Sequence, residues 1–95
     1  MRKIKLTSSF KRDQKRVDEN KLRPVIKERF AQALNSLANN EPLDYSYRDH
    51  ALIGNWKGYR ECHLAFDLVL IYQINDDNNT LELARIGSHS EVLGL

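Results

Sequence analysis

The segment "WKGYRECHLAFDLVLIYQI", residues 56–74, decides the fold of this 95-residue chain. Its second part, continued as "DLVLIYQIN" (67–75), is apolar without interruption at its centre, which is typical of a strand covered on both faces. Its first part, "YRECHLAF" (59–66), predicts a neighbouring mixed strand. Four polar residues stand at the edge of the apolar run: Arg60, Glu61, His63 and Asp67. Packing alone has no use for them, so we expect a functional site here.

The N-terminal half predicts one strand and two helices. "KIKLT" (3–7) alternates apolar and basic residues, as edge strands do. Ser8 or Ser9 offers the N-cap of a first helix. Pro24 suits the first turn of a second, amphipathic helix. That helix is expected to end near "NNEP" (39–42), where Asn can adopt a left-handed turn and Pro cannot continue the helix.

The C-terminal half predicts strands. After an irregular segment at 42–55 and the two strands above, "DDNN" (76–79) is a hairpin turn and "TLELARIG" (80–87) alternates as a last strand. The tail from 88 to 95 could form a short helical turn capped by Ser88. The expected order is β-α-α-β-β-β, an α+β fold in which two N-terminal helices pack on a small, mostly antiparallel sheet. The length predicts a single domain spanning residues 1–95.

Composition narrows the class of protein. Cys62 is the one cysteine of the sequence, which excludes an internal disulfide and fits a reducing compartment. No apolar run approaches the roughly 20 residues that span a bilayer. The start, "MRKIKLTSSF", lacks the apolar core of a signal peptide. We therefore expect a cytoplasmic protein without a membrane partner.

Charge is distributed unevenly along the chain. Residues 1–30 hold eleven of the fifteen lysines and arginines but four of the thirteen acidic residues. A basic segment can meet a phosphate backbone, although a solvated helix face has the same composition. The candidates for such phosphate contacts in this segment are Lys11, Arg12, Lys15 and Arg16.

Three histidines, His50, His63 and His89, all fall in the sheet-forming half, each beside a predicted turn or strand end. None lies within an apolar stripe, as a core histidine would. Asp67 stands near His63 in the sequence. A single histidine would mean little, but three of them beside a carboxylate point to a site.

Strand geometry restricts how these groups meet. Side chains alternate between faces, so Glu61 and His63 share one face, while Cys62 and Leu64 share the other. If the helices cover Cys62 and Leu64, the other two point to the open face. Arg85 on the neighbouring strand is then expected to come close to them.

This set of residue types fits cleavage of RNA. Histidine titrates near neutral pH and serves as general acid or base. Cationic side chains stabilise charge that develops on a phosphoryl group. RNA supplies its own nucleophile, the 2′-OH, so such an enzyme needs neither a metal nor a covalent intermediate, and we expect no cofactor. A metal site with His50, His63, His89 and Asp67 as ligands is the alternative, although motifs such as HExxH and CxxC are absent from the sequence.

The stretches "YRDHALIGNWKGYRECHLAFDLVLIYQI" (47–74) and "ARIGSHSEVLG" (84–94) resemble the YafQ group of the RelE-like toxins of bacterial toxin–antitoxin pairs. The resemblance covers nearly the whole chain. It implies a RelE-like fold and a ribosome-dependent mRNA endonuclease, or mRNA interferase. Such a toxin enters the 30S A site, cuts the codon there by 2′-OH attack and so inhibits translation. The implied partners are mRNA, ribosomal RNA and a cognate antitoxin, with operator DNA reached only through the antitoxin complex.

The resemblance also assigns roles to residues. By the family pattern, the catalytic positions are His50, His63, Asp67 and His89, with support from Glu61 and Arg85 around the scissile phosphate. Lys57 and Arg60 are expected to contact phosphate. We assign His89 as the general acid, and either His50 or His63 as the base.

Two positions depart from the pattern. Some relatives carry Trp where this chain has Leu68, and a terminal aromatic residue where it has Leu93. An aromatic side chain there could stack on a base. The departures leave a second hypothesis open, a non-catalytic module of the same fold that binds its antitoxin and co-represses transcription.

Overall fold

The computed structural model describes residues 1–19 and 24–94. Residues 20–23 of the basic segment and Leu95 lie outside this description. In chain order the elements are β1 (Lys3–Leu6), α1 (Ser8–Glu19), α2 (Pro24–Ala38), the 3-10 helix η1 (Tyr45–Tyr47), β2 (His50–Ala51), the 3-10 helix η2 (Gly54–Trp56), β3 (Arg60–Ala65), β4 (Leu68–Asn75), β5 (Thr80–Gly87) and α3 (His89–Leu93). The order confirms the predicted α+β fold.

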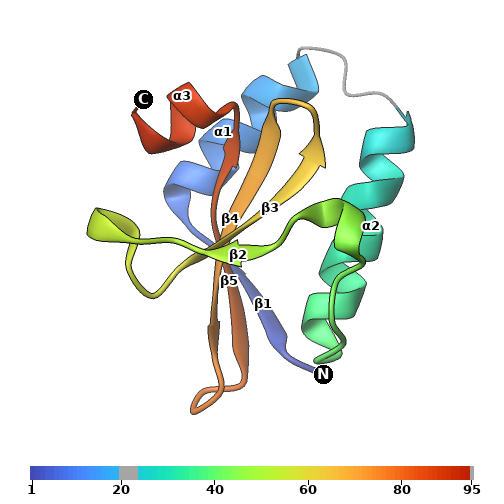
Figure 1. Ribbon diagram of the computed structural model, residues 1–95, viewed down its shortest axis with the longest axis vertical. Coiled ribbons are helices and arrows are strands. Elements are labelled where there is room, and N and C mark those ends of the chain that lie inside the picture. Colours follow the sequence, from blue (N-terminus) through green and yellow to red (C-terminus); the bar gives the residue numbers. More distant parts are fainter. Residues whose placement is uncertain (20–23, 95) are drawn as a thin grey trace.

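Across the described residues, the strands form one sheet of five with the order β1-β5-β4-β3-β2. β1 runs parallel to β5, and the other neighbours are antiparallel. Figure 1 shows the long β4–β5 hairpin at the centre of the molecule and α3 at the end of β5, beside α1. The sheet is therefore mostly antiparallel, as expected.

The helices cover one face of this sheet. Phe10 of α1 and Leu37 of α2 join a buried cluster with Cys62 and Leu64 of β3. Strand β4 is buried on both faces, because Leu70 and Tyr72 enter this cluster while Val69 and Ile71 face the other way. All four of these β4 side chains are fully buried. This confirms the prediction that the continuous apolar run is covered on both sides.

A second, smaller cluster covers the opposite face. Val69, Ile71, Ala84 and Val92 form its buried part, and α3 supplies Val92. Half-buried side chains from the loop between β2 and β3 pack around it: Leu52, Trp56 and Tyr59. The face that was predicted to be open is thus partly covered by α3 and this loop.

Three local expectations need correction. The N-cap of α1 is Thr7 rather than a serine, because the Thr7 hydroxyl accepts the Phe10 N–H at 2.9 Å. The segment expected to be irregular contains β2, whose His50 pairs with Glu61. Asp67 lies in the turn before β4 rather than in the strand, since Phe66 and Asp67 connect the paired residues Ala65 and Leu68. The predicted end of α2 is confirmed, with Asn40 in the left-handed conformation.

None of the helices in the described ranges has the length and apolar character needed to cross a bilayer.

Candidate functional site

Three histidines converge on one carboxylate oxygen. His63 Nε2 and His89 Nε2 each lie 3.1 Å from Glu61 Oε1, and His50 Nε2 lies 3.7 Å from the same atom. β2 and β3 bring His50, His63 and Glu61 together through their pairing, whereas His89 arrives at the start of α3. The ring centroids of His63 and His89 are 5.2 Å apart. The sequence placed these groups in one half of the chain, and the fold brings them into contact.

Glu61 is the buried centre of this cluster. Its residue is 2 % exposed, so the carboxylate lies under the imidazoles rather than on an open surface. A buried carboxylate is strongly disfavoured unless charged or hydrogen-bonded groups surround it. Here the groups close enough to donate are His63 Nε2 and His89 Nε2, each 3.1 Å from Glu61 Oε1. The expectation that Glu61 points to an open face is wrong in this respect, because the histidines close over it.

His89 is held between two carboxylates. Its Nδ1 lies 3.1 Å from Asp67 Oδ1, and its backbone N–H donates to the same oxygen at 3.2 Å. Since Nε2 faces Glu61, both ring nitrogens meet acceptors, and only the protonated imidazolium can donate from both. Burial lowers the pKa of His89, but the hydrogen bonds to Asp67 and Glu61 outweigh it and raise the pKa above its ordinary value. These contacts therefore favour the protonated form of His89.

His63 and His50 have different surroundings from His89. Burial lowers the pKa of His63, and this exceeds the opposing effect of the Glu61 carboxylate. His50 Nδ1 lies 2.8 Å from the carbonyl oxygen of Arg48. A carbonyl can only accept, so Nδ1 carries the proton and a neutral His50 presents an unprotonated Nε2. One proton donor and two potential acceptors thus share the site.

Asp67→Asn tests the electrostatic account of His89. The variant keeps the size of the side chain but removes one of the two negative charges that raise the pKa of His89, so this pKa should fall. We expect NMR titration of the His89 ring to show the decrease, and any activity that needs protonated His89 to decline at lower pH than in the wild-type protein. An unchanged His89 titration would contradict the role given to Asp67.

Arg85 does not join the cluster. Its Nε donates to Asp13 Oδ2 at 2.6 Å and its Nη2 to Asp13 Oδ1 at 3.1 Å. In the sheet, Ile71 stands between Glu61 and Arg85, which puts Arg85 two strands away, roughly 10 Å from Glu61. Within the described residues, no hydrogen bond or ion pair joins Arg85 to Glu61 or a histidine. The expected approach of Arg85 to Glu61 and His63 is not seen.

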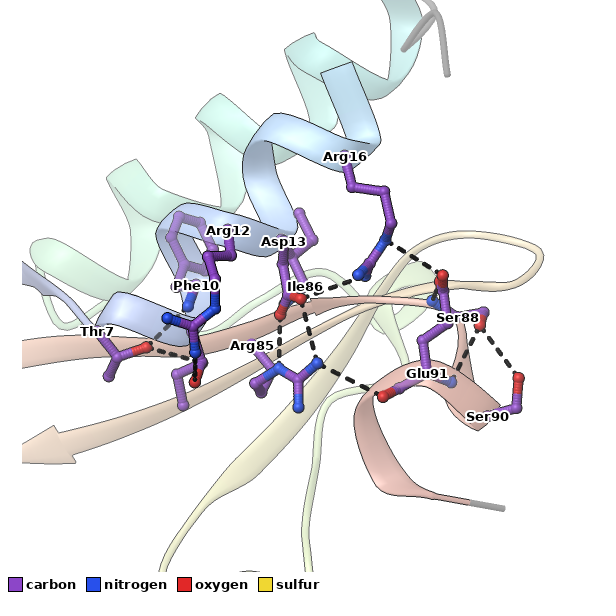
Figure 2. A network of polar contacts seen from close by, with 12 residues as sticks. Thr7, Phe10, Arg12, Asp13, Arg16, Arg85, Ile86, Ser88, Ser90 and Glu91 are labelled. Carbon is purple, nitrogen blue, oxygen red and sulfur yellow. Dashed lines mark hydrogen bonds and ion pairs between the residues drawn. The ribbon is translucent and has the colours of Figure 1, made fainter. Parts of the chain in front are cut away.

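Asp13 is instead the centre of a second polar network, which ties α1 to β5 and α3 (Figure 2). The carboxylate is almost fully buried and also accepts the Ile86 N–H at 3.2 Å. Arg16 spans the gap between helices, pairing with Asp13 and, at 3.2 Å, with Glu91 of α3. Glu91 also closes the capping box with Ser88. This network fixes the helix that carries His89.

Removing Asp13 should destabilise the fold. Burial raises the pKa of Asp13, but the bonds from Arg85 and Ile86 outweigh it and the pKa lies below its ordinary value. Asp13→Ala leaves these donors unpaired and should lower the free energy of unfolding by about 3 kcal/mol at neutral pH. The difference should shrink as pH falls through the acidic range, where the wild-type carboxylate also loses its charge. Urea unfolding measures this, with exposed Asp77→Ala as a control that should stay within about 0.5 kcal/mol.

The residues expected to bind RNA occupy different settings. Lys11, Arg12, Lys15 and Lys57 are exposed. Arg16 is engaged in the α1–α3 network, and Arg60 pairs with Asp49 at 2.9 Å, where the Tyr72 hydroxyl also bonds. Leu93 packs half-buried against the second cluster. Within the described residues, none of these candidates forms a hydrogen bond or ion pair with the three histidines or Glu61.

Sequence reasoning missed two charged residues. Asp13 stands three residues after Phe10, on the same helix stripe, so its burial was readable from the spacing. Arg48 lies in the segment expected to be irregular, and its charge is one of the causes that lower the pKa of His63. No pattern in the sequence placed that loop beside β3.

The histidine cluster also has the spacing of a metal site. One ligand atom each from His50, Glu61 and His63 lie within 4.8 Å of one another. Imidazole and carboxylate ligands suit Zn²⁺ and Cu²⁺. The set predicted from the sequence named Asp67 and not Glu61, but Asp67 is bound to the far side of His89. These residues could therefore bind a metal cation or form a site for proton transfer.

The chain is similar over nearly its whole length to known bacterial proteins. It is 34% identical over 94 residues to the mRNA interferase toxin YafQ of Escherichia coli B, covering 98% of this chain and 97% of that protein. The crystal structure of a metal-bound toxin from Helicobacter pylori matches with a TM-score of 0.87 and 40% identity, over 97% of this chain and 99% of that one. The YafQ chain of the E. coli DinJ–YafQ toxin–antitoxin complex matches with a TM-score of 0.83 and 31% identity, over 98% of both chains.

The two-layer fold thus occurs in a known class, the bacterial toxins of type II toxin–antitoxin systems. The family described as "Bacterial toxin of type II toxin-antitoxin system, YafQ" matches residues 2–94. The chain belongs to this YafQ toxin family. Its members in E. coli carry the name mRNA interferase, which supports endoribonuclease activity at the level of the family.

Proposed function

We propose that this chain is a ribosome-dependent endoribonuclease that cleaves mRNA in the A site by acid–base catalysis and thereby inhibits translation. The observation that carries the proposal is the meeting of three imidazoles at one buried carboxylate oxygen, with His89 held between Glu61 and Asp67. Residues 1–95 act as a single RelE-like toxin domain.

His50 serves as the general base. Its Nδ1 is occupied by the Arg48 carbonyl, and half of its side chain is exposed, so Nε2 is accessible to a substrate. His50 removes the proton of the 2′-OH, and the 2′ oxygen forms a bond to phosphorus. His63 lies between the two other rings. Its neutral ring covers Glu61, so an incoming phosphate meets less electrostatic repulsion than it would from an uncovered carboxylate.

His89 serves as the general acid. As the phosphorus–O5′ bond breaks, His89 gives its proton to the 5′ oxygen, which leaves as a hydroxyl. The other product carries a 2′,3′-cyclic phosphate, so atoms and charge balance without an external reagent. Glu61 and Asp67 hold the imidazolium in place and raise the pKa of His89, which favours its protonated form.

The partners follow from the relatives. The DinJ–YafQ complex supports binding of a cognate antitoxin by this chain, and operator DNA is reached through that complex. The exposed cations of α1, Lys11, Arg12 and Lys15, are available for ribosomal RNA. A cytoplasmic location follows from this function.

The test is cleavage of a defined mRNA with and without programmed ribosomes, with 5′ ends mapped by primer extension. Cuts within the A-site codon that require ribosomes support the proposal. If folded protein binds its antitoxin but makes no cut under either condition, the chain is the non-catalytic module that co-represses transcription.

Metal binding is a second candidate property, favoured by the spacing of His50, Glu61 and His63 and by the metal-bound toxin of H. pylori. A bound cation needs neutral histidines and would occupy the Glu61 oxygen that His89 requires. We therefore expect protein that has been treated with EDTA and then dialysed free of it to cleave ribosome-bound message as before, and added Cu²⁺ or Zn²⁺ to inhibit cleavage. The chelator is removed before the assay because ribosomes need Mg²⁺. Loss of cleavage after this treatment, restored by one metal, would overturn the metal-independent mechanism.

A further inference from the structure

A groove of about 680 Å³ opens beside the histidine cluster. Its walls come from the start of α2, the loop after η1 and the end of β3, represented by Val25, Arg48, His63 and Phe66. His63 belongs both to this groove and to the histidine cluster, so the groove borders the place where the RNA phosphate would sit. A nucleotide next to the cleaved bond would lie within reach of it.

Phe66 is the unusual side chain of this groove. It is 99 % exposed, in the turn directly before Asp67. Val25, which lines the groove from the start of α2, is also exposed. An exposed apolar residue alone is common on protein surfaces. An exposed aromatic ring beside the residue that holds the general acid is placed where a nucleobase could stack on it.

The charge of the groove favours an anionic occupant. Arg48 is exposed, and within the part of the chain that the structure describes its guanidinium makes no hydrogen bond or ion pair. Arg29 bonds the carbonyls of His63 and Leu64 and so adds a second cation to the same wall. Among the groove-lining residues there is no carboxylate. Cations next to an exposed aromatic ring are what a single-stranded nucleic acid requires.

We propose that this groove is the seat of a nucleotide of the message next to the scissile phosphate, with Phe66 stacking on its base and Arg48 facing its phosphate. The inference rests on the proposed function, because it uses the same RNA. It also bears on the two positions where this chain lacks the aromatic residue that some relatives carry. Leu93 packs against the second cluster and offers no ring, and Leu68 is half-buried at the start of β4. Phe66 provides an aromatic surface near the same site.

The first test separates stacking from simple apolar contact. Phe66→Leu keeps an apolar side chain without a ring, whereas Phe66→Trp keeps a ring. On ribosome-bound message, kcat/KM should fall roughly 5- to 100-fold for Phe66→Leu and stay near wild type for Phe66→Trp. Ile4→Ala, an exposed apolar residue on β1 at the opposite edge of the sheet, serves as the control and should have no effect. The pH profile should keep its shape in all variants, because Phe66 does not titrate.

The second test does not depend on cleavage. A message with a 2′-O-methyl group at the cleaved nucleotide and 2-aminopurine beside it reports stacking by loss of fluorescence. The wild-type protein and Phe66→Trp should quench it, and Phe66→Leu should not. Arg48→Ala should reduce the salt dependence of binding by about one unit of the logarithmic slope.

The outcomes distinguish this proposal from the function it rests on. If the wild-type protein cuts no message, the proposed function fails, while quenching of the uncut message still decides the groove. If the wild-type protein cuts and Phe66→Leu matches it in both assays, the groove proposal is wrong. A Phe66→Leu variant that binds RNA normally but loses affinity for the antitoxin would assign the groove to the antitoxin instead.

Discussion

His89→Gln should lower the single-turnover rate of mRNA cleavage by roughly 10²- to 10⁴-fold. Glutamine can still donate a hydrogen bond to Glu61, but it cannot transfer a proton to the 5′ oxygen. His89 is a third exposed and lies on the surface side of the buried carboxylate. The substitution therefore opens no cavity in the core, and we expect antitoxin binding and the urea midpoint to change little.

A change of leaving group identifies the step that His89 serves. A message with sulfur in place of the bridging 5′ oxygen has a leaving group that needs no protonation. If His89 is the general acid, this substrate should restore most of the rate of His89→Gln. It should not restore the rate of His50→Gln, because that variant lacks the group that removes the 2′ proton. Rescue of His50→Gln and not of His89→Gln would reverse the two assignments.

Much of the fold was predictable because its signals are local. The alternation in β1 and β5, the continuous apolar run of β4 and the proline and asparagines at the ends of α2 each determine structure within a few residues. The N-cap of α1 was misplaced by one residue because Thr7, Ser8 and Ser9 are all capable caps, and only the position of β1 selects Thr7. β2 was missed because two residues carry no periodic pattern.

The site was predictable in its members and not in its arrangement. Alternation along β3 put Glu61 and His63 on one face, which the structure confirms. The burial of Glu61 could not be predicted from the sequence, because it depends on β2 and α3, which bring His50 and His89 over its carboxylate. Arg85 was misplaced for a similar reason. A bulge after Ile71 and the buried Asp13 of a distant helix turn the guanidinium to α1.

Glu61→Gln should separate activity from stability. The variant keeps the shape of the side chain but removes the charge at the centre of the cluster. His89 then loses one of the two carboxylates that raise its pKa, and the imidazolium is less populated at neutral pH. We expect cleavage at pH 7 to fall roughly 10²-fold and the alkaline decline of the rate to move to lower pH. Glu82→Gln, on β5 outside the cluster, is the matched control and should leave both unchanged.

The free energy of unfolding of Glu61→Gln, relative to wild type, should increase with pH, whereas its cleavage rate should decline. In the wild-type protein the pKa of His89 is raised by folding, so its contribution is fully present below the unfolded pKa of about 6.5 and is lost as pH rises through the folded value. Above that pH, Glu61 is a buried carboxylate without a protonated partner, which is unfavourable. Relative to wild type, Glu61→Gln should therefore gain stability as pH increases from 6 to 9. Urea unfolding across this range measures the difference in free energy of unfolding between the variant and the wild type. A difference that does not change with pH would mean that Glu61 does not raise the pKa of His89.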